Sequence, residues 1–174
     1  MRSTITVRVL DAATARERIT GLSQVLLDCV DGGASVSFML PLAHDKARGY
    51  WQGVVDGVAR GERTLILAED QDGVLGTVQL ITDMPDNQPH RADVAKLLVH
   101  RRARGSGVGQ RLMEAAHAAA RAQGRTLLVL DTANAAAERL YERLGWQRVG
   151  AVPNFALMPD GAPCATTFFY KQLD

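Results

Sequence analysis

A short basic and glycine-rich segment, RRARGSGVGQRL at residues 101–112, is the part of the sequence best suited to holding a charged ligand. It precedes an apolar helical pattern, and the start of a helix offers unpaired backbone N–H groups and about half a positive charge. Glycines at 105, 107 and 109 would leave those N–H groups uncovered. The segment therefore predicts a site for a compact anion such as a pyrophosphate, with Arg102 and Arg104 adding charge around it.

Other anion-binding patterns fit this segment poorly. A dinucleotide-binding fingerprint needs glycine where Gln110 stands, and a triphosphate-binding loop needs a Gly-Lys pair that the chain lacks. Nucleic-acid binding favours interleaved aromatic residues, and none occurs at 101–112. A plain turn with a solvated arginine rim remains the alternative. It accounts for Arg101 and Arg111 but not for three alternating glycines.

Composition limits the function classes further. The chain has 174 residues, 47% of them hydrophobic, which predicts one domain spanning 1–174. Twenty basic and 19 acidic residues nearly cancel, so no nucleic-acid partner is expected. The two cysteines lie far apart and outside any Cys/His cluster, so no metal site is expected. Neither a signal-like apolar core nor an apolar run of about 20 residues occurs, which predicts a cytoplasmic protein without membrane association.

Hydrophobic periodicity and turn residues outline the elements that would position this segment. Strands are expected at 3–10, 63–70, 74–83, 92–100, 126–131, 146–152 and 165–173. Helices are expected at about 12–29, capped by Asp11, and at 44–59, 107–122 and 134–145. A loop containing Pro153, Pro159, Asp160 and Gly161 would join the last two strands. The order predicts an α/β (α+β) domain with a mostly antiparallel sheet of about seven strands, a parallel pair in the middle and four helices.

Two motifs resemble those of the GCN5-related N-acetyltransferases (GNAT). One is the acyl-CoA signature after an apolar strand, formed by Arg102, Gly105, Gly107, Val108, Gly109 and Leu112. The other is a later helix with Asn134, Ala137, Tyr141 and Gly145. The resemblance covers nearly the whole chain. It implies a single-domain enzyme that moves the acetyl group of acetyl-CoA directly to an amine, without a metal.

The resemblance also implies a cofactor site. The strand before the glycine segment would pair its backbone with the pantetheine arm and offer an N–H group to the thioester oxygen. Asn134 would bind the pantetheine amide, although a residue at a helix start is equally expected there. The implied cofactor-binding residues are Leu97, Leu98, Val99, Arg102, Arg104, Gly105, Ser106, Gly107, Val108, Gly109 and Asn134.

Three side chains are implied to be catalytic. Asp93, at the start of one strand of the parallel pair, and Asp131, at the end of the other, would bind and deprotonate the amine. Tyr141 would protonate the leaving thiolate. Each has a structural alternative: an exposed strand-end charge for Asp93, a helix N-cap for Asp131, and a core tyrosine with a bonded hydroxyl for Tyr141.

A narrower resemblance concerns the acceptor. The stretches DGGASVSFM, RADVAKLLV and LLVLDT are similar to those of the tabtoxin-resistance acetyltransferases, which acetylate a β-lactam amino acid. The resemblance implies resistance to a toxin or antibiotic and a small-molecule amine as substrate. The expected substrate-binding residues, in what is otherwise a plain interhelical loop, are Gly33, Ser35, Ser37 and Phe38.

Other interpretations remain open at this point. The same chemistry on a polyamine, an aminoglycoside or a protein N-terminus is one alternative, and a strongly acidic cleft would favour a polycation. A non-catalytic acyl-CoA-binding module is another. The sequence also leaves a homodimer open.

Overall fold

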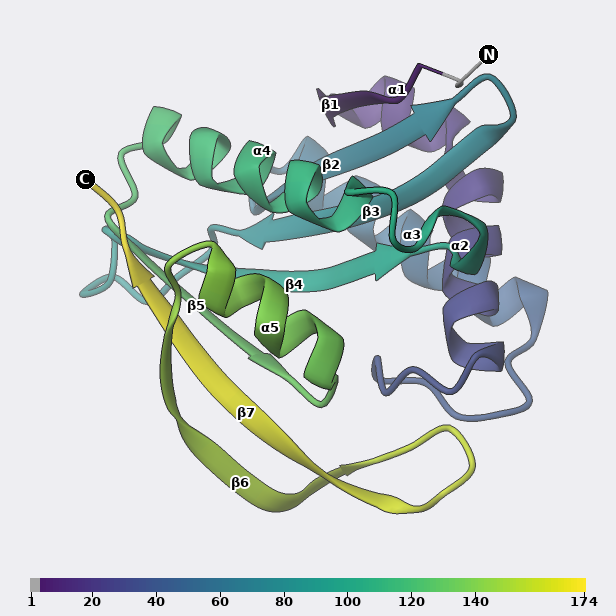
Figure 1. Ribbon diagram of the computed structural model, residues 1–174. Helices are drawn as coiled ribbons and strands as arrows, with labels where there is room; N and C mark the ends of the chain where they lie inside the picture. Colours follow the sequence, from purple (N-terminus) through teal and green to yellow (C-terminus); the bar gives the residue numbers. More distant parts are fainter. Residues whose placement is uncertain (1–3) are drawn as a thin grey trace.

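A seven-stranded sheet forms the centre of the computed structural model, which describes residues 4–174 (Figure 1). The strands are β1 (Thr6–Leu10), β2 (Arg63–Asp70), β3 (Gly73–Ile81), β4 (Arg91–Val99), β5 (Leu127–Thr132), β6 (Gln147–Leu157) and β7 (Pro163–Gln172). The helices are α1 (Ala12–Glu17), α2 (Ile19–Asp31), α3 (His44–Ala59), the 3-10 turn η1 (Arg101–Ala103), α4 (Val108–Ala122) and α5 (Ala135–Arg143).

The strands lie in the order β1-β2-β3-β4-β5-β7-β6, and every neighbouring pair is antiparallel except β4 and β5. That parallel pair is short. It runs from Arg91 opposite Leu127 to Asp93 opposite Val129, and beyond that point the two strands separate. The mixed sheet with a central parallel pair is as predicted, and the separation opens the sheet in its middle.

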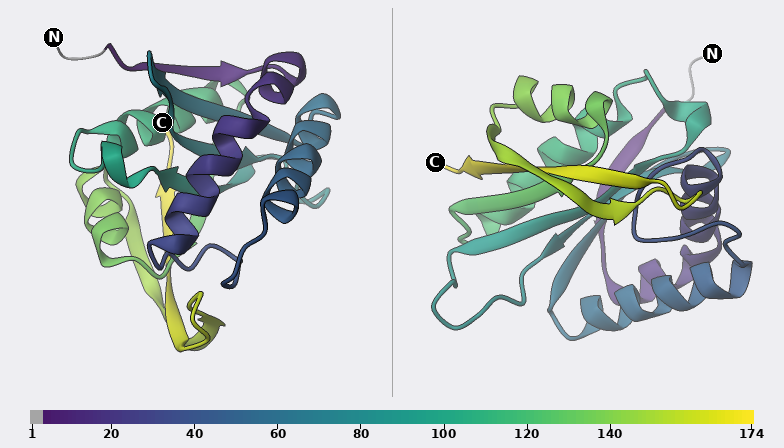
Figure 2. Two further views of the ribbon diagram at one scale, coloured as in Figure 1. Left: turned by 90° about the vertical axis from the view of Figure 1, so that its right-hand side faces the viewer. Right: turned by 90° about the horizontal axis from the view of Figure 1, so that it is seen from below.

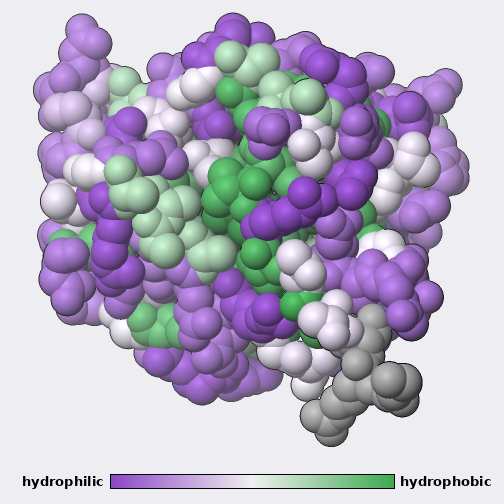
Figure 3. Space-filling model, turned by 90° about the horizontal axis from the view of Figure 1, so that it is seen from above, coloured by the Kyte–Doolittle hydropathy of each residue, from purple (hydrophilic) through white to green (hydrophobic). Residues whose placement is uncertain are grey.

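Helices cover both faces of the sheet (Figure 2). The first core lies beneath α2 and α3 and includes Leu22, Leu26 and Trp51. The second lies beneath α4 and α5 and includes Leu112 and Met113. Neighbouring residues of β2 alternate between these two cores, as the period of a strand requires. On the outer face drawn in Figure 3, hydrophilic residues predominate around a small apolar area.

The predicted helix at 12–29 is two helices, so residues 4–174 contain five α-helices where four were expected. Asp11 caps α1 as expected, its Oδ1 accepting a hydrogen bond from the Thr14 N–H at 2.7 Å. The chain then turns at Arg18, whose φ and ψ of −99° and 2° end α1. The Arg18 side chain forms an ion pair with Glu69 of β2 at 3.0 Å, and this contact holds the turn between α1 and α2 next to that strand. None of the helices within residues 4–174 is long and apolar enough to cross a membrane.

The last hairpin is longer than predicted. Strand β6 continues through Pro153 to Leu157, where a loop was expected. Proline has no backbone N–H group, but β6 is the edge strand and its register with β7 is interrupted between Val152 and Ala156. The prediction was wrong for Pro153, because an edge strand tolerates proline, whereas Pro159, Asp160 and Gly161 lie between β6 and β7 as expected. The extended hairpin reaches past the sheet toward the loop after α2 (Figure 2).

Candidate active site

Two pockets meet where β4 and β5 separate. We call them the hairpin pocket, of about 490 Å³, which includes residues of β6 and β7, and the glycine pocket, of about 420 Å³, which includes the turn before α4. The residues that line both are Ser35, Val36, Leu97, Thr132, Ala133 and Tyr141. A ligand in one pocket would therefore contact a ligand in the other at these side chains.

The start of α4 contributes bare backbone to the glycine pocket. Gly105 and Gly107 have φ angles of +73° and +82°, the left-handed region that glycine adopts without strain. Gly107 is the N-cap of α4 and supplies no side-chain cap, so the first N–H groups of this 15-residue helix are open to a ligand. The helix start and its bare backbone are as predicted.

Gly109 has a different role from the other two glycines. It lies inside α4, and a Cβ atom built on it would be 3.3 Å from Leu140 Cδ2 of α5 and 3.8 Å from Val99 Cγ2. Its missing side chain lets α5 pack closely against α4. Gly109 also lines the glycine pocket.

The arginines of the segment point to different places. Arg104 lines the glycine pocket and donates from Nε to the Val99 carbonyl at 3.3 Å. Arg102 is not among the lining residues, because both its Nη groups lie 3.3 Å from the Asp70 carboxylate. Arg101 is bound by Asp28, with its backbone N at 2.8 Å and its Nε at 3.0 Å.

Ser106 is also absent from the pocket lining, since its hydroxyl donates back to the Ala103 carbonyl. Gln110 and Arg143 line the pocket and were missed. Arg143 lies two residues after Tyr141 at the end of α5, and no motif marked it. Arg104 and Arg143 are thus the two cationic side chains that line this pocket within residues 4–174.

The remaining predicted cofactor residues line the glycine pocket together. They are Leu97, Leu98, Val99, Gly105, Gly107, Val108, Gly109 and Asn134. The first three follow the last residue of β4 that pairs with β5, so this edge of β4 is free to pair with an extended ligand. Asn134 also caps α5, with Oδ1 accepting from the Ala137 N–H at 3.0 Å, and its amide nitrogen remains a donor for a ligand.

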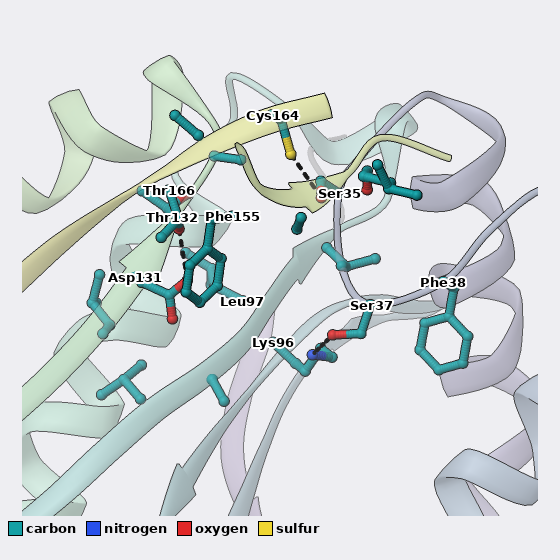
Figure 4. A pocket seen from close by; sticks show the side chains of 18 of the residues that line it. Ser35, Ser37, Phe38, Lys96, Leu97, Asp131, Thr132, Phe155, Cys164 and Thr166 are labelled. Atoms are coloured by element: carbon teal, nitrogen blue, oxygen red, sulfur yellow. Dashed lines mark hydrogen bonds between the residues drawn. The ribbon is translucent and has the colours of Figure 1, made fainter. Parts of the chain in front are cut away.

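The hairpin pocket contains three of the four predicted substrate-binding residues. Ser35, Ser37 and Phe38 line it from the loop after α2 (Figure 4). Gly33 lines the glycine pocket instead and ends α2 with a φ of +89°. There Gly33 N donates to Val30 O at 2.9 Å, and Ala34 N donates to Cys29 O at 3.0 Å.

Asp131 lies at the end of β5 with its carboxylate in the hairpin pocket (Figure 4). Its Oδ2 accepts a hydrogen bond from Thr166 Oγ1 at 2.6 Å. The structural alternative for this residue was a helix N-cap, but Asn134 caps α5. The carboxylate is thus oriented by β7 and remains available to a ligand.

Asp93 does not line either pocket. Its carboxylate pairs with Arg91, two residues earlier on β4. Burial raises the pKa of the Asp93 carboxyl, against the opposing effect of Arg91, and the charge of Asp131 raises it further. The two carboxylates are electrostatically coupled, but only Asp131 is placed to contact a ligand in the hairpin pocket.

Tyr141 lies at the meeting point of the two pockets. Tyr141 is 5% exposed, and its ring packs against those of Phe169 and Trp146, with ring centroids 5.8 and 5.9 Å away. Its hydroxyl has no hydrogen-bond partner within residues 4–174, unlike a core tyrosine with a bonded hydroxyl. Burial, and secondarily the charge of Asp131, raises the pKa of this phenol well above its usual value. The hydroxyl therefore carries a proton at neutral pH.

Lys96 lines the hairpin pocket and was missed by the sequence analysis. Between the pairs Thr77–Leu98 and Gln79–Ala95, β4 has one residue more than β3, which is a β-bulge. Lys96 lies in this bulge with a φ of +53° and donates from Nζ to Ser37 Oγ at 2.9 Å. A lone lysine in the apolar run VAKLLV was the signal that could have marked it.

No group of three or more His, Cys, Asp or Glu side chains within the described residues 4–174 could hold a metal ion. The lining of the two pockets offers a carboxylate, a protonated phenol, a lysine and open backbone N–H groups.

Comparison with known proteins agrees with this geometry. Residues 61–148 match the family model of the acetyltransferase (GNAT) domain. An N-acetyltransferase from Staphylococcus aureus Mu50 superposes with a TM-score of 0.81 at 19% identity, covering 99% of this chain and 100% of that one. The yncA protein of Salmonella typhimurium, solved with its cofactor acetyl-CoA, superposes with a TM-score of 0.77 at 21% identity, covering 98% and 94%.

A ribosomal-protein-alanine N-acetyltransferase from Brucella melitensis superposes with a TM-score of 0.79 at 20% identity, covering 97% of this chain and 99% of that one. At these identities the superpositions show a shared fold, and the family model carries the assignment.

Proposed function

The chain belongs to the GNAT acetyltransferase family, and from this premise we propose that it transfers the acetyl group of acetyl-CoA directly to the amine of a small, amino-acid-like molecule. The observation that carries the proposal is the junction of the two pockets at Tyr141. Direct transfer needs both substrates in contact, with a proton donor near the leaving thiolate and a carboxylate near the amine. The junction supplies that combination.

The glycine pocket fits acetyl-CoA. The uncapped start of α4 offers N–H groups to the pyrophosphate, and Arg104 and Arg143 add positive charge. The free edge of β4 at Leu97–Val99 offers backbone groups to the peptide-like pantetheine arm. Bound there, acetyl-CoA supplies a reactive thioester.

Residues of this chain can carry out the remaining steps of amide formation. Asp131 attracts the ammonium group and receives its proton, directly or through water, which frees the nitrogen lone pair. As the new C–N bond forms, a β4 N–H group stabilises negative charge on the carbonyl oxygen. As the C–S bond breaks, Tyr141 donates its proton to sulfur, the nitrogen releases its second proton to solvent, and Tyr141 regains one from solvent. The raised pKa of Tyr141 suits this acid role.

The charged side chains that line the hairpin pocket limit which amines can act as acceptor. A polyamine or an aminoglycoside would call for several carboxylates, but Asp131 is the one acidic side chain that lines this pocket within residues 4–174. A volume of about 490 Å³ suits a small molecule. Together with the resemblance to tabtoxin-resistance acetyltransferases, these features favour a small amino acid, including a β-lactam amino acid, as acceptor.

Release of the CoA thiol, measured with acetyl-CoA and a panel of amines, tests the proposal. We expect amine-dependent release by the wild-type protein and a fall in kcat/KM of about 100-fold or more in Asp131→Asn. Asp93→Asn is the matched control, because this carboxylate lies outside the pocket, and we expect a smaller loss. Calorimetric binding of acetyl-CoA without release for any amine would identify a non-catalytic module instead.

A further inference from the structure

Lys96 is a cation built into the proposed acceptor site by an irregularity of the backbone. In a regular strand, successive side chains point to opposite faces, whereas the consecutive residues 94–97 of β4 all line the hairpin pocket. The bulge and the positive φ of Lys96 produce this arrangement. A lysine rarely adopts such a φ, and residues held in such conformations cluster at functional sites.

The ammonium group of Lys96 has more hydrogen-bond donors than it has acceptors within residues 4–174. Ser37 Oγ accepts one hydrogen bond from Nζ, and Lys96 forms no ion pair within residues 4–174. A protonated lysine has three N–H donors, so at least one is left for a ligand or water. Burial lowers the pKa of Lys96, while the charge of Asp131 opposes that effect. A half-buried ammonium group with few partners is stabilised when an anion binds to it.

Lys96 and Asp131 are the two charged side chains that line the hairpin pocket within residues 4–174. They approach it from different strands, β4 and β5, on the two sides of the opening (Figure 4). The pocket thus presents a separated positive and negative charge to its contents. A molecule with both an ammonium and an anionic group is complementary to this pattern, and a simple amine or diamine is not.

We infer that Lys96 binds the carboxylate of the acceptor while Asp131 binds its ammonium group, so that the substrates are zwitterionic amino acids. The inference rests on the proposed function and adds a specificity-determining residue to it. Ser37 is a positioning residue, because its hydroxyl holds Nζ at the pocket wall. Selection then depends on the charge of the acceptor as well as on its size.

Matched acceptors test this inference. The probes are proteinogenic L-amino acids, their primary amides, which keep the amine but lose the negative charge, and the amines that lack the carboxyl group. For amino acids that wild-type protein acetylates, we expect kcat/KM to exceed that of the amide by about 10- to 100-fold. In Lys96→Met this preference should disappear, mainly through a higher KM for the acid, while amide acetylation remains. Lys96→Arg should restore part of the preference.

Lys46→Met serves as the control, because Lys46 is an exposed lysine on α3 outside both pockets. Acetyl-CoA binding by calorimetry and thermal unfolding show whether each variant keeps its fold and its cofactor site. If Lys96→Met loses acid, amide and amine acetylation equally with a low kcat, Lys96 is a proton acceptor or a structural residue and the inference is wrong. An unchanged acid-to-amide ratio in Lys96→Met also overturns it.

Failure of the proposed function gives a different result. Wild-type protein would then release no CoA thiol with any acid, amide or amine. A protein that acetylates amines but prefers the amides would retain the proposed transferase activity and reject the zwitterion.

Discussion

Tyr141 is buried by aromatic neighbours, yet it lines both pockets. The same burial that packs the ring raises the phenol pKa, so the group is held as a neutral donor. Asp131 is the opposite case, an exposed carboxylate whose position is fixed by one hydrogen bond from Thr166. At the scale of single residues, environment suits Tyr141 to the proposed acid role and Asp131 to the proposed binding of positive charge.

Tyr141→Phe tests the acid role with little change in packing. The phenylalanine ring fills the same space, and no protein hydrogen bond within residues 4–174 is lost with the hydroxyl. We expect kcat to fall about 100-fold or more, because the leaving thiolate loses its proton donor. The Kd for acetyl-CoA, measured by calorimetry, should stay within about threefold of the wild-type value. Full turnover in this variant would refute the assignment.

The turn that leads into α4 acts as a unit, and its function depends on backbone more than on charge. Gly105 and Gly107 take left-handed conformations, while two of the neighbouring arginines are occupied by Asp28 and Asp70. We therefore expect anion binding to come from the N–H groups at the start of α4, with Arg104 lining the same pocket. The arginines of the turn therefore differ in role: Arg104 lines the pocket, whereas Arg101 and Arg102 hold the turn in place through their ion pairs.

Gly107→Asp should therefore weaken acetyl-CoA binding far more than Arg101→Ala. The new carboxylate would compete for the N–H groups of α4 and repel a pyrophosphate, and a side chain at a φ of +82° adds about 1–3 kcal/mol of strain. Arg101 is bound to Asp28, so its loss should reduce affinity mildly and mostly at low salt. Calorimetric titration with acetyl-CoA measures both.

Gly124→Asp is the matched control for backbone strain. Gly124 has a φ of +72° at the opposite end of α4 and lines neither pocket. This variant should lose stability comparable to that of Gly107→Asp but retain acetyl-CoA affinity. Equal losses of affinity from Gly107→Asp and Arg101→Ala, or from both glycine variants, would contradict the role given to the helix start.

At the scale of the whole molecule, periodicity predicts the elements because each buries one apolar face. The order of elements along the chain, the central parallel pair and the start of α4 all follow from such local patterns. The break at Arg18 depends on Glu69, more than 50 residues away, and the length of β6 depends on its being an edge strand. Lys96 was missed for the same reason, since its bulge exists only relative to β3. Local patterns thus predicted the helices and strands, whereas pairing between distant segments determines which side chains line the pockets.

His117, on α4, is buried beside Trp146 of the second core and makes the stability of the fold depend on pH. It is 6% exposed, its Nε2 accepts a hydrogen bond from Trp146 Nε1 at 3.0 Å, and burial lowers its pKa from 6.5 to about 4. The unfolded chain therefore binds a proton between these pH values that the folded chain does not. The neutral histidine contributes stability above pH 6.5 that is lost as pH falls toward 4.

From pH 7.5 to pH 5, we expect the free energy of unfolding, measured in urea, to lose about 2 kcal/mol through His117. His117→Gln retains an acceptor for Trp146 but does not titrate, so its loss over the same range should be smaller by that amount. Asp93, whose pKa is raised, acts in the opposite direction but is present in both proteins and cancels in the difference. Identical pH dependence in the two proteins would contradict the prediction, because it would show that folding does not shift the pKa of His117.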